Sequence, residues 1–107
     1  MRSIPRHPRG IVVSDHAVMR FRERFQCLGG DDLTNEEIRR MIRGLVRNAT
    51  REFPSPKRST VIIKATLQSN GKPYPIYLIV LKKRRMDVIT VLDGESLTTW
   101  KENYGLF

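Results

Sequence analysis

The segment from residue 34 to residue 49 constrains the fold most, because its apolar residues follow the spacing of one helical face. Thr34 and Glu37, three residues apart, form a capping box that predicts where the helix begins. The apolar positions then recur at intervals of three and four residues over about three turns: Ile38, Met41, Ile42, Leu45, Val46 and Ala49. The sequence therefore predicts an amphipathic helix with one face in a core.

A shorter amphipathic segment precedes this helix. Ser14 stands where an N-cap is expected, and Ala17, Phe21, Phe25 and Leu28 then share one face. Two consecutive glycines end the pattern. We therefore expect two helices in the N-terminal half of the chain.

The composition changes after Pro54 and Pro56 to β-branched and aromatic residues, which favour strands. The prolines are expected to close the helical half. Asn70-Gly71 is a strong hairpin signal. Three strands are expected, over residues 60–67, 76–81 and 87–92, and short connections between them favour an antiparallel meander.

Two short segments complete the expected fold. Residues 11–13 are β-branched and are a candidate fourth strand at a sheet edge, and Ser96 can cap a short helical turn that carries Leu97 and Trp100. The expected fold class is α+β, with two N-terminal helices packed on a three- to four-stranded antiparallel sheet and a short C-terminal helical turn. At 107 residues the chain suits one domain over residues 11–107, preceded by a basic flexible arm at 1–10.

Charge points to a polyanionic partner. Lysine and arginine number 20 against 11 acidic residues, a formal charge of +9 at neutral pH. RNA is the expected ligand and DNA the alternative; a merely solvated basic surface, or an acidic protein partner, is the other interpretation of the same charge. The candidate nucleic-acid-binding residues are Arg6, Arg9, Arg22, Arg43, Arg47, Lys82, Lys83, Arg84 and Arg85.

Cysteine use and hydropathy bear on compartment and cofactors. Cys27 is the only cysteine, which excludes an internal disulfide and zinc sites built from several thiolates. No stretch approaches the roughly 20 apolar residues of a membrane span, and the N-terminus has no apolar signal segment. We expect a cytoplasmic protein with no membrane partner, no metal and no cofactor.

The segment "SDHAVMRFRERF" holds the residues best suited to chemistry. His16, Arg20 and Arg24 recur at four-residue spacing and so lie along one side of the helix. Like charges at that spacing repel, and a bound phosphate would relieve the repulsion. The positive helix end is expected to depress the pKa of His16 and keep it neutral, as a general base must be. The alternative interpretation is a solvated helix face on which Glu23 pairs with Arg20.

A metal-independent ribonuclease also needs an acid for the leaving oxygen. Lys64, Tyr77 and Thr90 lie on predicted strands and are open candidates, because nothing in their spacing selects one.

The same segment resembles the His-Ala-x-x-Arg-x-x-x-Arg opening of small bacterial and phage proteins in the barnase, EndoU, colicin and RelE superfamily. The resemblance covers roughly residues 11 to 92 and includes "LTNEEI", "PIYLIVL" and "DVITVL". It implies a single RelE/EndoU-like domain and, in many members, metal-independent ribonuclease activity. It maps the suspected catalytic groups onto His16, Arg20 and Thr90, beside Arg24 as a second phosphate ligand.

Two classes of function follow from these features. One is a toxin-like endoribonuclease with His16 as base and Arg20 and Arg24 as phosphate clamp, which an acidic antitoxin or host protein would silence. The other is a non-catalytic nucleic-acid-binding or phage and host-interaction module on the same fold, favoured by the incomplete set of catalytic residues.

Overall fold

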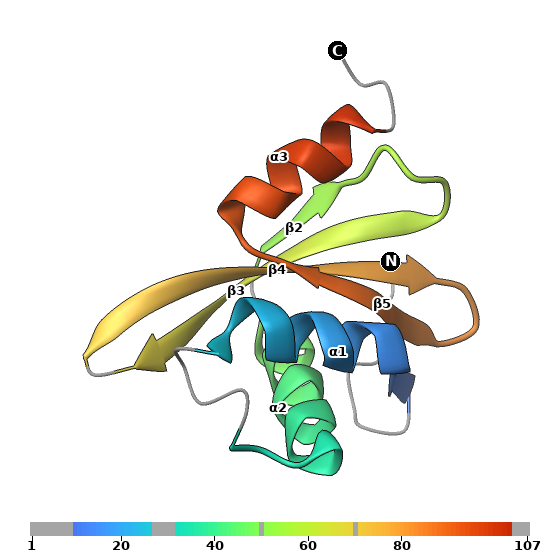
Figure 1. Ribbon diagram of the computed structural model, residues 1–107. Coiled ribbons are helices and arrows are strands. Elements are labelled where there is room, and N and C mark those ends of the chain that lie inside the picture. Colours follow the sequence, from blue (N-terminus) through green and yellow to red (C-terminus); the bar gives the residue numbers. More distant parts are fainter. Residues whose placement is uncertain (1–9, 27–31, 50, 70, 104–107) are drawn as a thin grey trace.

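The computed structural model describes residues 10–26, 32–49, 51–69 and 71–103 of the chain. Five strands form one sheet in the order β1-β5-β4-β3-β2, and helices lie on both of its faces (Figure 1). The elements are β1 (Ile11–Val13), α1 (Asp15–Arg24), α2 (Asn35–Asn48), β2 (Arg51–Pro54), β3 (Thr60–Ser69), β4 (Lys72–Lys82), β5 (Met86–Leu92) and α3 (Gly94–Glu102). The α+β class is confirmed.

Helices α1 and α2 cover one face of the sheet, and both begin where the sequence predicts. The Ser14 hydroxyl accepts a hydrogen bond from the Ala17 N–H at 3.0 Å, and the capping box of Thr34 and Glu37 is complete. Their apolar faces meet the sheet in the larger core. The most deeply buried helical residues are Ala17, Phe21, Ile38, Ile42 and Val46.

Helix α3 packs on the opposite face of the sheet (Figure 1). Leu97 and Trp100 of this helix cover a second, smaller core that contains Ile62, Ile79 and Leu92. The expected short helical turn was wrong, because α3 extends over nine residues, Gly94–Glu102. Its N-cap is not Ser96 but a carboxylate three residues earlier in the chain, which accepts the Ser96 N–H at 2.8 Å.

The antiparallel meander of β3, β4 and β5 is confirmed, but the expected sheet was wrong in two details. The strand β1 does join the sheet beside β5, yet it runs parallel to its neighbour. Three residues contain too little pattern to fix the direction of a strand. The sheet is therefore mixed rather than antiparallel.

The second difference is β2, an edge strand where the sequence predicted a break. Pro54 is its last residue and pairs with Val61 of β3. Proline is tolerated at the edge and end of a sheet, because its missing N–H faces no partner strand there. The proline that signalled a stop therefore closes a strand.

Candidate nucleic-acid interface

His16 is exposed on the first turn of α1. Within the part of the chain that the structure describes, it makes no hydrogen bond and no ion pair. One turn further on, the Arg20 guanidinium pairs with the Glu23 carboxylate at 2.9 Å. The expected alignment of His16 with Arg20 on the helix is present, but Arg20 already has an anionic partner of its own.

Arg24 takes part in the fold. Its Nη1 donates to the Val91 carbonyl of β5 at 2.6 Å. At the other end of the helix, the Ser14 hydroxyl donates to the Ile89 carbonyl at 3.3 Å. Strand β1 pairs with β5 only as far as Val88, so the later carbonyls on this side of β5 have no partner strand. The side chains of Ser14 and Arg24 donate hydrogen bonds to two of these carbonyls. The side chain predicted to hold phosphate thus satisfies an edge carbonyl.

Thr90 stands on the face of the sheet opposite α1. It is the register partner of Ile79, which lies in the core under α3, and it is 8% exposed. A β-bulge next to this pair explains the placement, because Val80 pairs with Val88 while Ile79 pairs with Thr90. The bulge shifts the alternation, so Thr90 does not share the face of Val88. The four candidate catalytic residues are therefore not brought into one site.

Two arginines of α2 also donate hydrogen bonds to the sheet. The Arg39 Nε donates to the Val13 carbonyl at 3.3 Å, and the Arg43 Nε donates to the Ile11 carbonyl at 3.2 Å. Both carbonyls belong to β1, an edge strand. Because these two edge carbonyls already accept hydrogen bonds from side chains, they are less available to pair with a strand of another molecule.

The remaining candidate ligands of nucleic acid differ in their surroundings. Arg22 donates to the Leu33 carbonyl at 2.8 Å and to the Asn35 side chain at 2.6 Å, which ties α1 to the start of α2. Arg47 is exposed near the end of α2. Arg6 and Arg9, with most of the predicted basic arm, lie outside the described residues.

A group of six cations lies at one end of the sheet, on the β2–β3 loop and the β4–β5 turn. The two connections are joined by a hydrogen bond from the Lys82 N–H to the Ser59 carbonyl at 2.9 Å. The loop also contains a side-chain hydrogen bond from Thr60 to Ser55 at 2.6 Å. We call this surface the basic tip, and it consists of Lys57, Arg58, Lys82, Lys83, Arg84 and Arg85.

Lys82 and Arg85 of the tip have acidic partners among the described residues. Lys82 pairs with Glu52 at 2.9 Å, and Arg85 pairs with Asp87 at 2.8 Å. The exposed residues Arg58, Lys83 and Arg84 make no ion pair within the described ranges. The β4–β5 part of this tip was predicted from its run of four basic residues. The β2–β3 part was missed, because neither the strand β2 nor the loop after it was expected.

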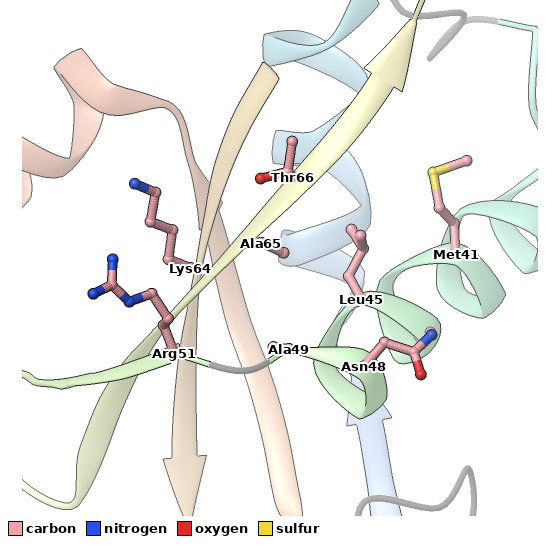
Figure 2. Close-up of a pocket in the computed structure, with 9 residues that line it drawn as sticks. Met41, Leu45, Asn48, Ala49, Arg51, Lys64, Ala65 and Thr66 are labelled. Atoms are coloured by element: carbon pink, nitrogen blue, oxygen red, sulfur yellow. The ribbon is translucent and has the colours of Figure 1, made fainter. Parts of the chain in front are cut away.

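A shallow hollow of about 540 Å³ lies between α2 and β3 (Figure 2). Apolar side chains of Met41 and Leu45 line it from the helix. In Figure 2, the side chains of Arg51 and Lys64 extend next to each other on the side of β3 away from this helix. They are register partners on neighbouring strands, which fixes their proximity. Sequence reasoning missed Arg51, because its strand was not predicted.

Comparisons with protein-family models, with curated proteins and with solved structures give no significant match. Across the described residues, the structure has no helix with the length and apolar character of a membrane span.

Proposed function

We propose that this protein binds nucleic acid, with RNA as the expected ligand, and that the basic tip is its main phosphate-binding surface. The observation that carries the proposal is the composition of the tip. Its two hydrogen-bonded connections, residues 55–59 and 82–85, contain six cations and no acidic residue. Glu52 and Asp87 offset two of these charges, and a polyanionic ligand would relieve the repulsion among the remaining cations.

The tip suits a phosphate backbone better than it suits a small anion. Guanidinium groups bind phosphate oxygens in pairs and stay charged in any environment, and Arg58 and Arg84 are both exposed here. Lys83 adds a flexible point charge beside them. The cations lie on two separate turns, so several phosphates of one chain can be contacted together. Binding of this kind releases counterions and weakens steeply with salt.

Fluorescence anisotropy with a labelled single-stranded RNA tests the proposal. The Lys83→Ala/Arg84→Ala variant removes two exposed tip charges and is expected to weaken RNA binding at least tenfold. The matched control, Arg40→Ala/Lys72→Ala, removes two exposed charges elsewhere, one on α2 and one at the far end of β4. It is expected to weaken binding much less. Equal losses in the two variants would mean that only net charge matters and would overturn the assignment to the tip.

A metal-independent ribonuclease is the second candidate. The observation that favours it is the exposed imidazole of His16, one helical turn from Arg20. In this mechanism His16 takes the proton of the ribose 2′-hydroxyl, and the 2′-oxygen bonds to the adjacent phosphorus while the bond from phosphorus to the 5′-oxygen breaks. The 5′-oxygen takes a proton from water, and Arg20 leaves Glu23 to bind the reacting phosphate.

End-labelled RNA incubated with the protein in EDTA separates the two candidates. Products with 2′,3′-cyclic phosphate ends that disappear in His16→Ala, while RNA affinity persists, would establish the enzyme. Intact RNA with salt-sensitive binding supports the binding protein.

A further inference from the structure

Helix α3 covers only part of its face of the sheet. Its main contacts are with β4 and β5, and its Leu97 and Trp100 also pack against the small core that includes Ile62 of β3. Two cross-strand rows lie on this face toward the edge strand β2. In one, Arg51 pairs with Lys64 and Lys64 with Tyr77; in the other, Phe53 pairs with Ile62.

Phe53 is the exposed aromatic residue of this surface. It lies on the edge strand β2 and is 38% exposed. The Arg51 guanidinium stands over its ring, with 5.9 Å between the guanidinium carbon and the ring centroid. The ring lies beside the cations Arg51 and Lys64, and an exposed aromatic ring flanked by cations is an arrangement on which a nucleobase can stack.

A hollow of about 220 Å³ adjoins the Phe53 ring. Ile62 and Leu97 form its apolar part, while Lys64 and Lys101 bring positive charge from β3 and α3. Among the residues that the structure describes, no carboxylate lines it. The hollow thus offers an apolar surface for a planar ring and cations for a neighbouring phosphate.

The hollow lies a short distance along β3 from the basic tip. From Lys64 to Thr60, β3 advances by four residue steps, or about 13 Å at the usual rise of a strand. The β2–β3 loop and the tip follow directly. One extended chain of a few nucleotides can therefore contact both surfaces.

From these contacts we infer that the hollow binds an unpaired nucleobase of single-stranded RNA, stacked on Phe53, with Arg51, Lys64 and Lys101 contacting its flanking phosphates. The inference rests on the proposed function and narrows it to single strands. In a duplex each base is paired and stacked inside the helix, so none is available to the hollow. The tip, in contrast, contacts phosphates of either form.

The test uses the full chain and two probes: a single-stranded RNA octamer with 2-aminopurine at its centre, and a blunt RNA hairpin whose two strands are joined by a non-nucleotide linker, so that it has no unpaired base. Phe53→Leu keeps an apolar residue on the strand and removes the aromatic ring. It is expected to weaken octamer binding about 5- to 150-fold, the equivalent of about 1–3 kcal/mol for one stacked base. It should leave hairpin binding unchanged and abolish the change in 2-aminopurine fluorescence that stacking causes.

Two further variants make the result decisive. Phe53→Tyr keeps the ring and is expected to bind the octamer like the wild type. Lys64→Gln/Lys101→Gln leaves the ring in place and is expected to weaken the octamer more than the hairpin. It provides the same test if Phe53→Leu alters folding.

The outcomes separate the two proposals. Unchanged octamer binding by Phe53→Leu, together with loss of both probes in Lys83→Ala/Arg84→Ala, overturns the base-binding hollow and leaves the function of the tip standing. Full binding of both probes by the tip variant overturns the function proposed for the tip, and failure of the wild type to bind either probe overturns both proposals.

Discussion

Replacing Arg24 by Met removes the guanidinium and keeps most of the side chain's length. The partly buried hydrogen bond from Arg24 to the Val91 carbonyl is lost, at an N–O distance of 2.6 Å. A hydrogen bond from a charged donor contributes about 1.5–3 kcal/mol, and part of that loss is the cost of an unsatisfied carbonyl. We expect Arg24→Met to destabilise the fold by about 1–3 kcal/mol.

Urea unfolding followed by circular dichroism measures this loss. Because urea m-values of small domains are about 1–3 kcal/mol per M, a loss of about 2 kcal/mol lowers the midpoint by roughly 1 M. Arg20→Met is the matched control, since its ion pair with Glu23 is on the surface and is worth at most about 0.5 kcal/mol. An Arg24→Met protein as stable as the control, but with much weaker RNA binding, would refute the structural role and restore Arg24 as a phosphate ligand.

Three further predictions concern stability. Thr34→Ala removes the N-cap of α2 and is expected to cost about 1 kcal/mol in urea unfolding, whereas Thr34→Asn keeps a capping side chain and should retain most of the stability. Ile42→Ala opens a cavity at a fully buried position and is expected to cost about 2–5 kcal/mol by the same measurement; a loss below about 1 kcal/mol would contradict the packing described. The free energy of unfolding should also decrease as the pH is lowered into the acidic range. The Thr34 N–H lowers the pKa of Glu37 and the Ser96 N–H lowers the pKa of Asp93, so both contributions are present above the ordinary values of 4.5 and 3.8 and are lost as the pH falls below them. Urea midpoints that do not change between about pH 6 and pH 3 would contradict this sign.

The helices α1 and α2 and the central strands could be predicted from local pattern. The capping residues and apolar faces of these two helices are encoded within a few neighbouring positions, as in Thr34 and Glu37. The parallel pairing of β1 with β5 depends on contacts between residues more than 70 positions apart, such as Ile11 with Met86, and three residues give no periodicity to reveal it. The strand β2 was hidden for a related reason, because Pro54 is locally typical of a break.

The candidate site was harder to predict than the fold. The spacing of Arg24 and Arg43 gives their helix face but not their acceptors, which are strand carbonyls distant in sequence. The prediction for Thr90 assumed that side chains alternate regularly along its strand. The bulge beside Thr90 breaks that alternation and places the residue on the other face of the sheet. The cations of the β4–β5 turn were evident because they are consecutive. The hydrogen bond from Lys82 to Ser59 that brings this turn next to the loop with Arg58 joins residues far apart in the sequence, so local pattern does not reveal it.

The salt dependence of RNA binding measures how many phosphates the basic tip contacts. Single-strand binding constants fall with a log–log slope of about −0.7 for each neutralised phosphate. If Lys83 and Arg84 each contact one phosphate, anisotropy titrations from about 50 to 300 mM KCl should give Lys83→Ala/Arg84→Ala a slope shallower than that of the wild type by about 1.4. The Arg40→Ala/Lys72→Ala control should retain the wild-type slope. Identical slopes for the wild type and the tip variant would contradict the account.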